Sequence, residues 1–279
     1  MSLRDHLQGR RPRSVTKTPV AKIALLALIL TGLLGGIIFL TIKSQTTRIS
    51  TEADTLCRSD QAPSAVTVLL LDMSDEFTEP QRLKITNELD RIKTDIPRFG
   101  LIEAYAVDRV DQGVIKPVVH RCNPGNGDDL SPLYQNPELA RIKWKSFSQE
   151  VNRELDRLMA RPESPTSAIF EAVQATALRT FNRPAYEGVP KHLVIVSDLL
   201  QNVPNKLSQY KGAQPFSEFQ RTPYFSEVRA DLTDVTVTVL YLVRPHTPQK
   251  WPEHYKFWEQ YFLAQGATVD RVEPVYGAH

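Results

Sequence analysis

Three oxygen-bearing side chains follow an apolar run early in the chain. Residues 66–71 are six apolar or β-branched residues in a row, and the run ends at Asp72. This pattern is typical of a central strand that is covered on both faces of a sheet. Ser74 and Glu76 then follow Asp72 at every second position. Carboxylates and hydroxyls are hard oxygen donors, so the cluster favours Mg²⁺ or Mn²⁺ over zinc or copper.

Two further oxygen-rich segments lie far from Asp72 in the sequence. Thr166 and Ser167 begin a helical pattern, and Asp198 ends a second apolar run over 192–197. If strands and helices alternate in direction, all three segments fall at the carboxyl edge of one sheet. Open α/β sheets bind their ligands at this edge.

The elements that must position these residues alternate between strand and helix patterns. Strands are predicted over 66–71, 99–107, 114–120, 192–197, 235–243 and 268–275, and helices over 79–96, 137–160, 166–181 and 252–265, with one helix in the loop-rich stretch 199–234. The link between 99–107 and 114–120 is so short that these two strands must be antiparallel. The pattern predicts a doubly wound, Rossmann-like α/β fold with a mostly parallel sheet and one antiparallel edge strand.

The first of the oxygen-rich segments resembles a von Willebrand factor A domain with a metal-ion-dependent adhesion site. That family carries D-x-S-x-S after its first strand. Asp72 and Ser74 match the motif, and Glu76 stands in place of its second serine.

The other two segments extend the resemblance. The run S-A-I-F-E-A-V from Ser167 is similar to the family's T-A-L-Y-D-A-I and puts Ser167 at the position of the ligand threonine, with Thr166 as the alternative. Asp198 matches the acid after the family's fourth strand, and Leu199 stands where glycine is usual. The resemblance covers about residues 64–275 in the order of strands and helices.

The resemblance implies a Mg²⁺ or Mn²⁺ ion at these residues, with one position open to a carboxylate of a protein partner. Glu76 as a third carboxylate would leave the occupied site with a charge of −1, so an acidic partner would be repelled or would have to displace Glu76. In the alternative interpretation, Glu76 faces solvent, and Asp72 and Asp198 cap helix N-termini, where anions are favoured.

Residues 23–42 contain no charged side chain and are bracketed by Lys22 and Lys43. This length matches the roughly 20 residues that cross a bilayer, and it exceeds the ~7–15-residue apolar region of a cleavable signal. Six basic residues precede the segment and two follow it closely: Arg4, Arg10, Arg11, Arg13, Lys17 and Lys22, then Lys43 and Arg48. The imbalance predicts a cytoplasmic tail over 1–22, a membrane helix over 23–42, a linker over 43–63 and a periplasmic or other extracytoplasmic domain over 64–279.

The two cysteines fit an oxidising compartment. Cys57 lies nine residues before the first strand and Cys122 just after the third, so both fall at the amino edge of the sheet. A disulfide is predicted, and two unrelated free thiols are the alternative. Within the membrane segment, Gly32 and Gly36 have the G-x-x-x-G spacing that packs two helices into an oligomer, although glycine is common in such helices by chance.

The function we expect is recognition of a protein partner by a membrane-anchored domain, as one component of an envelope assembly. A formal net charge of +2, with much of the positive charge in the first 22 residues, argues against nucleic-acid binding. No enzymatic activity is expected. A scaffold with a decayed metal site is one alternative. A haloacid dehalogenase-like phosphatase with Asp72 as nucleophile is another, but Ser74 stands where its second acid would be.

Overall fold

The computed structural model describes residues 20–46, 50–107, 116–132, 135–161, 164–212, 214–244, 249–250 and 253–277. The basic residues of the segment 1–19 and the first residues of the strand predicted over 114–120 lie outside these ranges. The chain divides into two units, of which one contains the apolar helix and the other contains the sheet with its helices.

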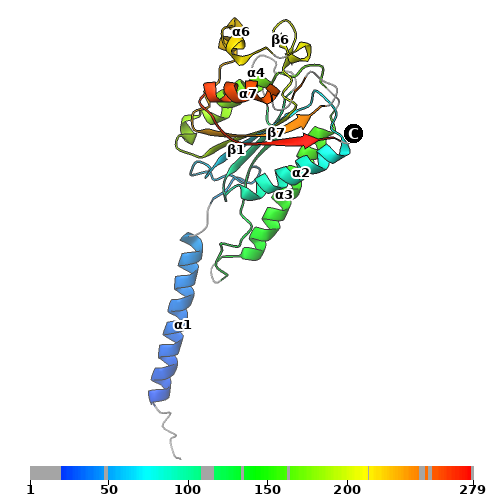
Figure 1. Cartoon of the computed structure of the whole chain (residues 1–279). Helices are drawn as coiled ribbons and strands as arrows, with labels where there is room; N and C mark the ends of the chain where they lie inside the picture. The colour runs from blue at the N-terminus through cyan, green and yellow to red at the C-terminus, as the bar shows by residue number, and fades with distance from the viewer. Residues whose placement is uncertain are drawn as a thin grey trace, which may run out of the picture. The chain divides into compact units, whose positions relative to one another are not determined.

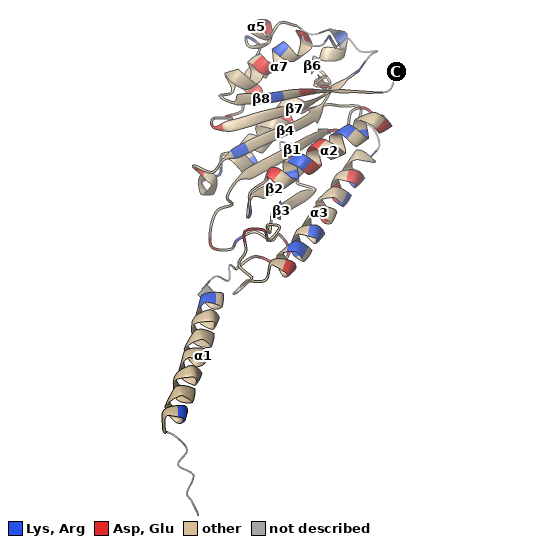
Figure 2. Cartoon of the chain, turned by 60° about the horizontal axis from the view of Figure 1, so that its bottom comes forward, with Lys and Arg blue, Asp and Glu red and all other residues tan. Residues whose placement is uncertain are grey.

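The apolar helix α1 spans Val20–Thr46 and includes the predicted segment 23–42. Figure 2 shows it without charge along its length and with basic residues only near its ends. By length and composition α1 can cross a membrane.

A six-stranded sheet with the order β3-β2-β1-β4-β7-β8 forms the centre of the second unit. Its strands are β1 (Val66–Asp72), β2 (Leu101–Val107), β3 (Val119–Cys122), β4 (Lys191–Ser197), β7 (Val235–Val243) and β8 (Thr268–Tyr276). Among these described strands, β3 alone runs antiparallel to its neighbour. The predicted fold class is therefore confirmed, including the antiparallel edge strand.

Helices cover both faces of the sheet (Figure 1). One face carries α2 (Glu79–Asp95) and α3 (Pro137–Met159), and the other carries α4 (Ile169–Thr176) and α7 (Glu253–Ala264). The side chains of β1 alternate between the two cores, with Leu69 and Leu71 on the first face and Val68 and Leu70 on the second. This placement explains why β1 reads as a continuous apolar run. A capping box closes the start of α2, since the Gln81 Oε1 accepts a hydrogen bond from the Thr78 N–H at 3.1 Å.

The stretch 199–234 differs from the prediction of one helix. It forms a small hairpin of β5 (Asn202–Val203) and β6 (Leu207–Ser208), followed by the short helices α5 (Phe216–Phe219) and α6 (Pro223–Glu227). Three of its aromatic residues, Phe216, Phe219 and Tyr224, do not form a helical stripe; they pack around Phe170 and Phe257. These contacts come from distant elements, so local periodicity gave no sign of them.

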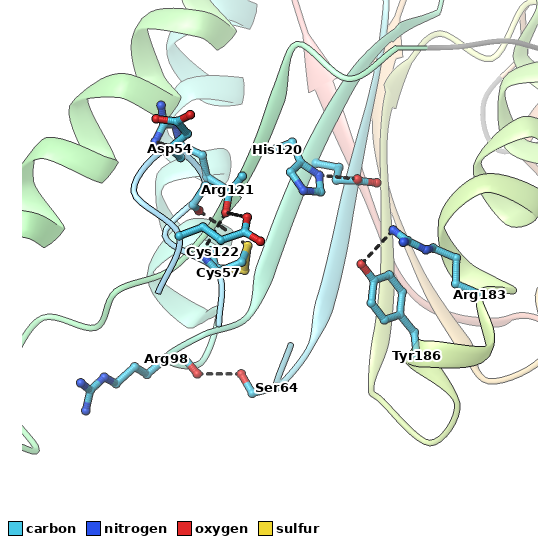
Figure 3. The surroundings of a disulfide bond; sticks show 12 residues. Asp54, Cys57, Ser64, Arg98, His120, Arg121, Cys122, Arg183 and Tyr186 are labelled. Carbon is cyan, nitrogen blue, oxygen red and sulfur yellow. Dashed lines mark hydrogen bonds and ion pairs between the residues drawn. A yellow bond between two sulfur atoms is a disulfide. The ribbon is translucent and has the colours of Figure 1, made fainter. Parts of the chain in front are cut away.

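The predicted disulfide between Cys57 and Cys122 is present, with a Cα–Cα distance of 4.8 Å. It joins the segment before β1 to the end of β3 (Figure 3). The Cys122 N–H donates to the Thr55 carbonyl at 2.8 Å, and Arg121 donates to the carbonyl of Asp54 and to the carboxylate of Glu150 on α3. The segment is thus held to the sheet edge by a covalent bond and by several hydrogen bonds.

Candidate metal centre

Asp72 is the last residue of β1 and lies at the centre of the candidate site. Its Oδ2 accepts hydrogen bonds from the Ser167 hydroxyl at 2.8 Å and the Ser197 hydroxyl at 2.6 Å. Its Oδ1 accepts from the Ser74 N–H at 3.0 Å. The carboxylate is only 3% exposed. Burial raises the pKa of Asp72, and the hydrogen bonds from Ser197, Ser167 and Ser74 oppose this rise.

The segment before α4 brings Ser167 to this carboxylate. Ser167 and Asn202 exchange two backbone hydrogen bonds, of 3.0 and 2.8 Å, so β5 holds the segment in place. Gln201 fixes the start of α4, because its Oε1 accepts from the N–H groups of Ile169 and Phe170. The Thr166 hydroxyl lies 3.3 Å from that of Ser164 instead. Of the two candidates at the threonine position, Ser167 is therefore the one in contact with Asp72.

Asp198 follows β4 and is 2% exposed. Its Oδ1 accepts from the Leu200 N–H at 2.9 Å, whereas its Oδ2 is buried and accepts no hydrogen bond from the described residues. Burial and then the nearby charge of Asp72 raise the pKa of Asp198 well above its ordinary value. A buried carboxylate oxygen without a donor is unfavourable, so it is the feature of this edge that most needs a cation.

Neither aspartate caps a helix, contrary to one alternative interpretation of the sequence. The N-terminus of α2 is capped at Thr78, six residues after Asp72. The Asp198 carboxylate instead accepts a hydrogen bond from the N–H of Leu200 in the loop that follows β4.

Asp75, rather than its neighbour Glu76, directs its carboxylate toward the other acids. The Tyr210 hydroxyl donates to Asp75 Oδ2 at 3.1 Å, and Asp75 contributes to the raised pKa of Asp198. The Glu76 side chain is exposed, and its backbone carbonyl accepts a hydrogen bond from Arg244 at 2.8 Å. The role of Glu76 as a ligand remains a prediction.

A cation of the chain itself lies at this edge. Arg244, the residue after β7, places its Nε 3.6 Å from the Oδ2 of Asp198. Gln249 supports this placement, because its Oε1 accepts from the Arg244 N–H at 2.8 Å and its Nε2 donates to the Asp198 carbonyl at 2.7 Å.

The donor set fits a hard divalent cation held by few carboxylates. Among the described residues, no group of three or more His, Cys, Asp and Glu side chains is arranged to hold a metal ion. A cation here would be held by Asp198, by hydroxyls such as those of Ser74 and Ser167, and by water. Asp72 would act mainly by orienting Ser167 and Ser197, since its Oδ2 already accepts hydrogen bonds from both of these hydroxyls. Such oxygen-and-water coordination is usual for Mg²⁺.

Sequence reasoning missed Asp75, Arg244 and Gln249. Asp75 lies within the D-M-S-D-E run, so the acid itself was visible although its direction was not. The other two come from the segment after β7, and no motif marks them.

No protein-family model and no curated protein matches this sequence. The chain is similar to the solved structure of the conserved hypothetical protein BatB from Bacteroides thetaiotaomicron, with 11% identity over 75% of this chain and 91% of that one, and a TM-score of 0.39. An aerotolerance-related membrane protein from Bacteroides fragilis shares 14% identity over 75% and 92% of the two chains, with a TM-score of 0.35. A von Willebrand factor type A protein from Catenulispora acidiphila shares 14% over 76% and 39%, with a TM-score of 0.37. Similarity at this level identifies neither a ligand nor a partner for this chain.

Proposed function

We propose that the second unit is a von Willebrand factor A-like recognition domain that binds Mg²⁺ or Mn²⁺ at the carboxyl edge of its sheet. The observation that carries this proposal is the buried Oδ2 of Asp198, which lacks a hydrogen-bond donor among the described residues and lies near a second buried carboxylate. Two buried carboxylates repel each other, and a divalent cation removes that repulsion.

The domain binds a protein partner through this ion and performs no catalysis. By resemblance to the family, a carboxylate of the partner occupies the open coordination position. Tyr210, which is 36% exposed and hydrogen-bonded to Asp75, stands beside the position at which a partner would arrive.

The anchor is α1, with the preceding tail in the cytoplasm and the recognition domain in the periplasm or another extracytoplasmic space. This placement agrees with the disulfide, because such bonds persist in oxidising compartments. The domain then serves as one component of an envelope assembly. The spacing of Gly32 and Gly36 permits a second copy to pack against α1.

Titration calorimetry with MnCl₂ on the full chain in detergent tests the metal proposal. Wild type is expected to bind one ion, and Asp198→Asn is expected to weaken binding by about 10–100-fold or more. Asp270→Asn is the matched control, since Asp270 is an exposed aspartate near the start of β8, and binding should not change. Absence of binding to wild type would favour a metal-free scaffold domain, whereas equal binding to Asp198→Asn would place the ion elsewhere on the chain and overturn the proposed site.

A further inference from the structure

We propose that Arg244 is a resident cation of the site that competes with the divalent ion for Asp198. This inference rests on the proposed metal binding and adds the residue that controls its strength. The guanidinium of Arg244 takes the position of a counter-charge for Asp198 Oδ2, which is the one buried carboxylate oxygen of the described residues without a hydrogen bond.

The placement of Arg244 is built into the fold. Its side chain is 14% exposed, with Nε on Asp198 and Nη1 donating to the Glu76 carbonyl at 2.8 Å. One guanidinium therefore connects the ends of β7 and β4 with the loop that follows β1. Gln249 holds both residues of the ion pair in place, since it accepts a hydrogen bond from the Arg244 N–H and donates one to the Asp198 carbonyl.

The competition follows from charge and space. The guanidinium is charged at every accessible pH, so it repels a divalent cation at short range throughout. An ion bound through Asp198 Oδ2, directly or through water, needs the volume that the Arg244 head group fills. Binding must move that group, and the Arg244 bond to the Glu76 carbonyl is then lost as well. Ion binding therefore breaks the hydrogen bond between Arg244 and the Glu76 carbonyl, and this cost lowers the apparent affinity of the site for the ion.

Removing the guanidinium is therefore expected to strengthen metal binding. Arg244→Gln should lower the Kd for Mn²⁺ by about tenfold or more, because a full positive charge leaves the vicinity of the ion. Arg244→Lys keeps the charge but cannot bridge Asp198 and Glu76 in the same way, so its Kd should lie between those of wild type and Arg244→Gln.

A matched control comes from α2, the helix that follows the loop after β1. The Arg82 Nε donates to the Phe77 carbonyl at 3.3 Å, and Arg82 forms no salt bridge with a described carboxylate. Arg82→Gln thus removes one arginine from α2 without touching Asp198, and it should leave the Kd within about twofold of wild type if the effect depends on close charge.

Manganese titration of the four full-length proteins, each checked for folding by circular dichroism, tests the competition. Arg244→Met, which keeps an unbranched stem, replaces Arg244→Gln if the glutamine variant does not fold. Tighter binding to the neutral Arg244 variant than to wild type and Arg82→Gln supports the inference. Equal Kd values for wild type and the neutral variant overturn it while the metal site stands. Failure of every protein to bind Mn²⁺ overturns the competition and the proposed function together.

Discussion

At the scale of single residues, Leu199 has an unusual backbone conformation next to the site. It follows Asp198 with a φ of 59°, in the left-handed region where glycine is usual. Its side chain is nevertheless fully buried. The strain of this conformation is about 1–2 kcal/mol for a residue with a Cβ. The stabilisation gained by burying the side chain is larger than this strain, because truncating a buried leucine lowers stability by about 2–5 kcal/mol.

We therefore expect Leu199→Gly to lower the free energy of unfolding by about 1–3 kcal/mol despite relieving the strain. Urea denaturation measures the change. Asn205→Gly is the control, since Asn205 has a φ of 62° with an exposed side chain, and it should be neutral or slightly stabilising. A Leu199→Gly protein as stable as wild type would mean that strain, and not burial, dominates at this position.

A second residue-scale feature is the buried carboxylate of Glu103. Burial alone would raise the pKa of Glu103, but hydrogen bonds from His120, Thr180 and Tyr105 outweigh it, and the pKa lies below its ordinary value. The folded state therefore favours the ionised carboxylate. Its contribution to stability is present above the ordinary pKa of 4.5 and is lost as the pH falls through the lowered folded value.

Glu103→Gln is expected to lower the free energy of unfolding by about 1–3 kcal/mol at neutral pH, because charged hydrogen bonds are lost in a buried position. The difference from wild type should shrink below pH 4.5, where glutamate in the unfolded chain binds its proton. Thermal unfolding as a function of pH measures both. A difference that stays constant from pH 7 to pH 3 would show that the charge of Glu103 contributes nothing.

At the scale of elements, most regular helices and strands could be predicted because each has a continuous pattern. The exceptions are β3, which ends at Cys122 and not at His120, and α4, which begins at Ile169 and not at Thr166. The helix predicted over 137–160 is α3 within one residue, and the strand over 235–243 is β7. The hairpin of β5 and β6 could not be predicted in this way. Its pairing with Ser167 and the contacts of Gln201 with α4 arise only when distant segments meet. The same limit applies to the site, where Asp72 and Asp198 were visible but Arg244 and Gln249 carry no local signal.

The disulfide is the element-scale feature with the clearest energetic consequence. It joins two cysteines, Cys57 and Cys122, that are 65 positions apart in the sequence. The chain-entropy model gives a stabilisation on the order of 4 kcal/mol for a loop of this length. Replacing both cysteines by alanine should lower the free energy of unfolding by a comparable amount in denaturant titrations, and a reductant should then have no further effect. Equal midpoints with and without reductant in the wild type would show that the bond does not stabilise the fold.

At the scale of the whole molecule, the basic tail, α1 and the disulfide all favour a domain outside the cytoplasm. Protein taken from membranes under alkylating conditions should therefore contain no free thiol. Non-reducing mass spectrometry measures this directly, and a reduced sample supplies the control with two labelled cysteines. Two alkylated cysteines in the unreduced sample would contradict the proposed topology.

The central claim is that a divalent cation binds at the carboxyl edge of the sheet, and anomalous scattering from Mn²⁺-soaked crystals tests it most directly. One peak is expected among the side-chain oxygens of Asp198, Ser74 and Ser167, next to Asp72. The Arg244 guanidinium should have moved away from Asp198 in the same crystals. A map with no peak at this edge, or with its peak elsewhere on the domain, would contradict metal binding at this site.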